Sequence, residues 1–149
     1  MTLYDTINDE IKRAMLARDK VRLDTLRGIK KELLEAKTAK DAPDELTQEM
    51  VIAILQRMVK QRKESADIYA SSGRDELAEN EIDQMNVIRE YLPEQLSEEE
   101  LEAAIKKIIA DTGATSMKEM GKVMAIATKE LAGRAEGRAI SNQVKNLLS

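Results

Sequence analysis

The stretch MKEMGKVMAIATKELAGRAEGR, residues 117–138, combines helical periodicity with two glycines. Its apolar residues fall on one face at about 100° per residue, and they are Met120, Val123, Met124, Ala127 and Leu131. Gly133 follows this run, and Gly137 opens another that contains Ile140 and Val144. Because glycine readily ends a helix in a left-handed conformation, the stretch predicts a helix, a turn at Gly133 and a last helix from about Gly137. No strand precedes the glycines and no Gly-Lys-Ser/Thr follows them, so they do not form a phosphate-binding P-loop.

Helical periodicity also runs through the chain before this stretch, and no segment there alternates like a strand. We expect a first helix from Thr2. Asp19 and Thr47 are predicted to cap the second and third helices, because Asp and Thr side chains cap helix N-termini well. Pro43 breaks the second helix, and Gly73 turns the third helix back into a fourth. The apolar face of the fourth helix is expected to carry Leu77, Met85, Ile88 and Leu92.

Shorter helices follow the fourth one. Ser97 with Glu100 is a predicted capping box for the next helix, which Gly113 ends. Ser116 with Glu119 predicts a second capping box at the start of the stretch described first.

A domain boundary is expected between the long and the short helices. The sequence therefore predicts an all-α protein, with an N-terminal helical hairpin bundle in residues 1–94 and a small three-helix domain in residues 95–149.

Composition excludes several classes of chemistry. The 149 residues contain no Cys and no His, which removes disulfides, thiolate metal sites, imidazole bases and Ser-His triads. A Ser-Lys or a carboxylate-only mechanism stays open, but no residue spacing indicates one. We therefore predict no metal, no cofactor and no evident catalytic centre. No apolar run approaches the ~20 residues that span a bilayer, and the N-terminus lacks a signal-peptide core. A soluble protein without a membrane partner is expected, either cytoplasmic or from the inside of an organelle.

One charge on each helix of the predicted hairpin points along an apolar face. Arg62 falls within the apolar arc of the third helix, and Glu81 lies between Ile88 and Leu92 on the fourth. The structural interpretation is a partly buried ion pair that fixes the register of the hairpin. The functional alternative makes Arg62 an anion ligand and Glu81 a general base. The structural interpretation is favoured, since buried charges are usually paired.

A stripe of lysines lies opposite the apolar face of the 117–138 stretch. Lys118, Lys122 and Lys129 share this side at helical spacing. Their neighbours, Gly121, Ala125, Ile126 and Thr128, are all small or uncharged. An ordinary solvated face is one interpretation. Contact with nucleic acid is the other, because a solubilising face commonly alternates Glu with Lys at i,i+4 and this one does not.

The net charge of the C-terminal part of the chain also favours contact with nucleic acid there. Residues 113–149 hold six Lys and Arg against three Glu, a net charge of +3 in a chain of net charge −4. With three Tyr and no Phe or Trp, base stacking cannot dominate. Contacts to phosphates and to the shape of a folded RNA fit better.

Several motifs in series resemble one protein family. The segments LQRMVKQRKESADIY, GRDELAENE, REYLPEQLSEEEL and MGKVMAIATKELAGRAEGRAISNQVKNLL are similar to the YqeY family along essentially the whole chain. The C-terminal part also resembles the tail domain of GatB, a subunit of the glutamine-dependent amidotransferase that acts on misacylated tRNA. The motif MGKVM places Gly121 and Lys122 on that tail's motif, and GRAEGR matches its interhelical turn. Family members often have Asp where Glu136 stands, and Glu is a poorer cap for the last helix.

The resemblance implies a small helical GatB/YqeY-type domain and a tRNA-binding accessory role. The association is with a carbon–nitrogen ligase that uses glutamine as amido donor, whose catalytic domains are absent here. The candidate nucleic-acid-binding residues are Lys118, Gly121, Lys122, Lys129, Arg134 and Arg138. The expected partners are tRNA and an amidotransferase or aminoacylation protein, with no DNA. One alternative is a protein–protein interaction adaptor in translation or aminoacylation, and another is a free-standing amidotransferase.

Overall fold

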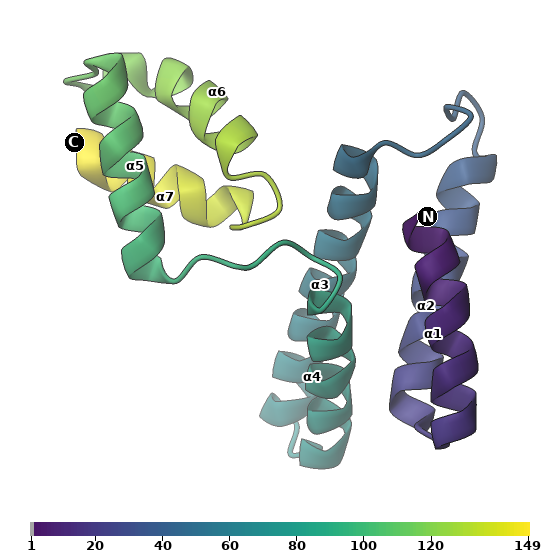
Figure 1. Cartoon of the computed structure of the whole chain (residues 1–149). Helices are drawn as coiled ribbons and strands as arrows, with labels where there is room; N and C mark the ends of the chain where they lie inside the picture. The colour runs from purple at the N-terminus through teal and green to yellow at the C-terminus, as the bar shows by residue number, and fades with distance from the viewer. Residues whose placement is uncertain (1) are drawn as a thin grey trace. The chain divides into compact units, whose positions relative to one another are not determined.

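The computed structural model of the protein describes residues 2–149, which contain seven α-helices and no strand (Figure 1). The all-α prediction is confirmed. The chain forms two compact units, one that runs through Leu92 and one that comprises Pro93–Ser149. This division lies two residues before the expected boundary.

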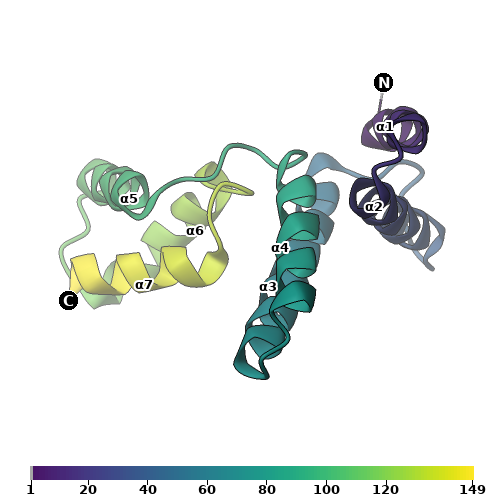
Figure 2. The same ribbon diagram turned by 90° about the horizontal axis from the view of Figure 1, so that it is seen from below.

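The first unit consists of two helical pairs. Its helices are α1 (Leu3–Ala17), α2 (Lys20–Thr38), α3 (Gln48–Ser71) and α4 (Asp75–Arg89). Helices α3 and α4 form a hairpin and lie side by side in Figures 1 and 2, while α1 packs on α2 and α2 packs on α4. The predicted caps Asp19 and Thr47 each accept a backbone hydrogen bond, as does Thr2 before α1, and Gly73 makes the turn with φ +77°.

An aliphatic core joins the four helices of this unit. Its fully buried side chains include Ile7, Leu26, Ile29, Leu55 and Ile88. The prediction for Leu77 is wrong, because this side chain is 46% exposed and Ala78 occupies the buried position beside it. Close to the Gly73 turn the buried residues of α3 and α4 are the small Ala66 and Ala78, which allow the helices to approach closely.

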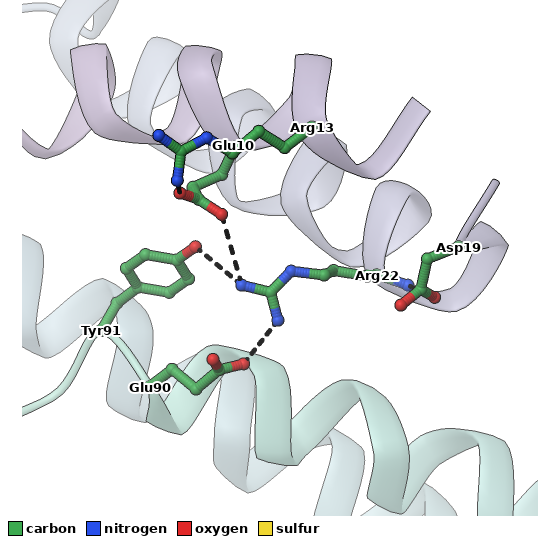
Figure 3. A network of polar contacts seen from close by, with 6 residues as sticks. All are labelled: Glu10, Arg13, Asp19, Arg22, Glu90 and Tyr91. Carbon is green, nitrogen blue, oxygen red and sulfur yellow. Dashed lines mark hydrogen bonds and ion pairs between the residues drawn. The ribbon is translucent and has the colours of Figure 1, made fainter. Parts of the chain in front are cut away.

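A polar network spans three helices of the first unit (Figure 3). Arg22 of α2 donates to Glu90, just after α4, at 2.7 Å, and it lies 3.6 Å from Glu10 of α1. Its other Nη donates to the hydroxyl of Tyr91 at 3.5 Å. The hydrogen bond to Glu90 raises the pKa of the Arg22 guanidinium, and burial raises the pKa of Tyr91. Arg22 thus connects α1, α2 and the end of α4.

The second unit is built from three α-helices and one short 3₁₀ turn. These are α5 (Glu98–Thr112), the 3₁₀ turn η1 (Met117–Glu119), α6 (Met120–Glu130) and α7 (Gly137–Leu148). Each helix packs on the other two. Ile105, Val123, Ala127 and Val144 are completely buried at their centre.

The two predicted capping boxes have different outcomes. Ser97 and Glu100 cap α5 reciprocally, and Gly113 ends that helix with φ +72°, so both predictions are confirmed. The box of Ser116 and Glu119 is not formed. The carboxylate of Glu119 instead accepts a hydrogen bond from the backbone N–H of Thr115.

The α5 capping box makes the start of that helix sensitive to acid. Hydrogen bonds from the backbone and side chain of Ser97 lower the pKa of Glu100. The stabilisation is therefore fully present above the unfolded-state pKa of about 4.3, and it is lost as pH falls through the lowered folded-state value. We expect Glu100→Gln, which can still form the box, to remove this acid dependence while leaving the helix intact at neutral pH. The pH dependence of the Ser97 amide NMR signal measures the effect, and an unchanged profile in the variant would contradict it.

Candidate nucleic-acid interface

The lysine stripe is fully displayed to solvent. Lys118, Lys122 and Lys129 are exposed, while Val123 and Ala127 on the other side of α6 are buried. The ion pairs found within residues 2–149 use none of these three lysines. The second unit thus presents ammonium groups that its own carboxylates do not neutralise.

Lys118 differs from the other two lysines in its backbone. It lies in η1, whereas Lys122 and Lys129 lie in α6. At this point the carboxylate of Glu119 accepts a hydrogen bond from the backbone N–H of Thr115, and the first turn has the tighter 3₁₀ geometry. The prediction of one continuous helix over all three lysines is therefore wrong at its first turn.

Gly121 leaves an open surface beside Lys122. It is exposed within α6, and a Cβ added there would meet nothing within 4 Å apart from its chain neighbours and the backbone of its own helix. Glycine lowers helix stability by about 1 kcal/mol relative to alanine. Packing within the protein therefore does not explain this glycine.

A partly buried turn joins α6 to α7. Gly133 adopts φ +77° as predicted, although α6 ends earlier, at Glu130. The carbonyl of Gly133 accepts from Gln95 Nε2 at 2.6 Å, and that of Arg134 accepts from the Leu96 N–H at 2.9 Å. The segment before α5 is thereby fastened to the turn.

Arg134 contributes to this fastening with its side chain. Its Nε donates to the carbonyl of Glu94 at 3.3 Å, and the residue is half-buried. Its positive charge also contributes to the lowered pKa of Glu100. Arg134 thus helps to hold the turn in place. The sequence predicts a phosphate contact for Arg134 and does not indicate this structural role.

Arg138 is exposed in the first turn of α7. Glu136 precedes that helix without a side-chain capping bond, which confirms the expectation of a poor cap. The first turn itself holds Arg138 and no acidic residue, and the nearest carboxylate in the sequence is that of the N-cap residue Glu136.

The predicted ion pair of Arg62 and Glu81 is not formed. Arg62 Nη1 donates to the Met58 carbonyl at 3.2 Å, one turn back on α3. Its Nη2 lies 3.7 Å from the point where a side chain at Gly28 of α2 would begin. The guanidinium therefore packs against α2 beside Gly28 and does not reach Glu81. Neither residue belongs to an ion pair in the described part of the chain.

Sequence reasoning missed Gln95 and Leu96. They donate hydrogen bonds to the α6–α7 turn just before Arg138, to carbonyl groups 38 residues further along the chain. The signal that could have indicated them is the polar run after Pro93, which forms no helix before Ser97.

Within residues 2–149, no three acidic side chains converge as a metal site would require. No helix among these residues combines the length and the apolar character needed to cross a bilayer.

Comparisons with known proteins identify one family and several relatives. A family described as Yqey-like protein matches residues 4–148. The relatives include a protein from Kluyveromyces lactis named "Altered inheritance of mitochondria protein 41, mitochondrial", which is 26% identical over 93% of this chain and 72% of its own length. A protein of the same name from Pyrenophora tritici-repentis is 25% identical over 93% of this chain and 77% of its own length. One from Vanderwaltozyma polyspora is 30% identical over 70% of this chain and 57% of its own length.

Proposed function

Because the chain belongs to the YqeY family, we propose that it is a tRNA-binding accessory protein, related to the tail domain of glutamine-dependent tRNA amidotransferase and without a catalytic centre of its own. The observation that carries the proposal is the set of exposed lysines on α6 that no carboxylate pairs. Such cations bind phosphates by releasing condensed counterions, which makes the affinity strongly dependent on salt.

The composition of the second unit restricts how it would bind RNA. Tyr4, Tyr69 and Tyr91 are the only aromatic residues of the chain, and all three precede Pro93. Stacking of unpaired bases on aromatic rings is therefore not available on this unit. Contacts to phosphates and sugars along a folded, double-helical RNA fit its surface, which favours tRNA.

The direct test is retention of a tRNA transcript by the unmodified protein in a gel shift at low salt. Retention that weakens steeply as salt rises is expected. Absence of retention even at low salt would refute the proposal.

Gly121 offers a test of close approach by the RNA. We expect Gly121→Leu to weaken tRNA binding about tenfold, because a side chain there would hold a phosphate away from Lys122. The same change should raise helix stability by up to about 1 kcal/mol, since the position is exposed and a Cβ there meets no other element of the protein. Fluorescence anisotropy with labelled tRNA and thermal unfolding measure the two effects. Unchanged affinity in a stabilised variant would exclude this surface as the contact.

A second candidate function is docking on an amidotransferase or aminoacylation protein. It is favoured by the exposed Ile68, Leu77 and Ile82 on the α3–α4 hairpin, which the core of the first unit leaves uncovered. A protein partner that remains bound after nuclease treatment and in high salt would support it.

We propose the cytoplasm or the interior of an organelle as the location. The relatives are named as mitochondrial proteins, and tRNA is present in both compartments.

A further inference from the structure

The outward face of α7 carries cations and amides but no carboxylate. Arg138, Asn142 and Lys145 recur at i, i+4 and i+7, so they lie in one stripe, and all three are exposed. Ile140, Val144 and Leu148 cover the opposite face and are buried in the core. The helix is therefore fixed by its apolar side and presents this stripe to solvent.

The polar atoms of the stripe have no partners within the described part of the chain. No ion pair there uses Arg138 or Lys145. The Asn142 amide makes no hydrogen bond with residues 2–149, whereas the exposed Asn80 on α4 accepts one from Gln84 at 2.7 Å. The amide of Asn142 thus has its donors and its acceptor free between two cations.

An ordinary solvated helix would show a different pattern. The outward face of α4 includes Asp75, Glu76, Glu79 and Asp83, with the acids gathered toward its N-terminus as the helix dipole favours. On α7 the N-cap residue Glu136 is the one acid at the start of the helix, and the first turn holds the cation Arg138, which the helix dipole disfavours there. Violations of local rules that bring no structural gain are concentrated at functional sites.

From this pattern we infer that α7 recognises the sugar edge of an RNA double helix, with Asn142 hydrogen-bonding a 2′-hydroxyl between phosphates held by Arg138 and Lys145. This inference rests on the proposed function and adds discrimination of RNA from DNA. The wide, shallow minor groove of A-form RNA displays 2′-hydroxyls to a helix lying across it. A 2′-hydroxyl both donates and accepts, and so does a carboxamide. The two cations are about 10 Å apart along the helix, which leaves room for the amide contact between them.

The test compares binding of a tRNA transcript with binding of a DNA of the same sequence, by fluorescence anisotropy at low salt. Asn142→Ala is expected to raise the Kd for RNA about three- to tenfold, as loss of a hydrogen bond does, and to leave the Kd for DNA unchanged. Lys145→Ala should weaken both and lower the salt dependence by about one phosphate contact.

Asn86→Ala, at an exposed position of α4, is the matched control and should change neither Kd. Because alanine favours helix more than asparagine does, unfolding of α7 would not explain a loss, and circular dichroism verifies this. If the unmodified protein binds tRNA but Asn142→Ala changes RNA and DNA binding equally or not at all, the inference is overturned and the proposed function stands. If the unmodified protein does not bind tRNA, both fall.

Discussion

Replacement of Lys122 and Lys129 by Glu is expected to abolish retention of tRNA at low salt. Both side chains are exposed and unpaired on α6. Reversal at a phosphate contact replaces an attraction with a repulsion, each about 1 kcal/mol for ions ~4 Å apart in water. Two reversals therefore cost about 4 kcal/mol, or roughly a thousandfold in Kd. A gel shift across a series of protein concentrations measures the loss.

The matched control for this double variant is Lys60→Glu with Lys63→Glu. These lysines are also exposed and outside the ion pairs of the described chain, but they lie on α3. The control makes the same change in net charge and should retain most of the affinity. Equal losses in both double variants would show that overall charge, and not the α6 surface, determines binding.

Truncation of Ile105 to Ala is expected to have the largest effect on stability. Ile105 is completely buried at the centre of the second unit. Such a truncation typically costs 2–5 kcal/mol, which is comparable with the whole stability of a helical unit this small, about 3–8 kcal/mol. We therefore expect α5, α6 and α7 to lose much of their structure, and tRNA binding with it. Amide NMR signals of the second unit report the change, with those of the first unit as the internal reference.

Ile109→Ala is the control for this truncation. Ile109 lies on the same helix one turn later and is only partly buried. The same side-chain change should lower the free energy of unfolding clearly less there, because folding buries less apolar surface at this position. Equal destabilisation by the two variants would contradict the assignment of Ile105 to the centre of the core.

Features that depend on residues close in sequence were predictable. The caps formed by Thr2, Asp19, Thr47 and Ser97 follow from side chains that reach a backbone N–H three residues ahead. The buried faces of α6 and α7 follow from the spacing of their apolar residues. In each case the sequence of one helix and its cap contains the pattern that determines the feature.

Features that depend on which helices pack together were not predictable. A helical wheel places Arg62 on the inner side of α3, but it does not indicate that Gly28 of α2 lies there to receive the guanidinium. It likewise does not show that the hairpin narrows at Ala66 and Ala78 and leaves Leu77 outside. For the candidate site, the exposure of the lysines was predictable from α6 itself, whereas the engagement of Arg134 with Glu94 required the tertiary structure.

The fastening of the 94–96 segment to the α6–α7 turn defines the shortest fragment that could carry the binding surface. A fragment that begins at Ser97 would retain every helix of the second unit. It would nevertheless leave the Gly133 and Arg134 carbonyls without the donors Gln95 and Leu96. The turn that positions the start of α7 would then be loosened, and Arg138 with it. Expression of the isolated second unit should therefore start at Pro93, since this unit includes non-helical chain that its helices alone do not delimit.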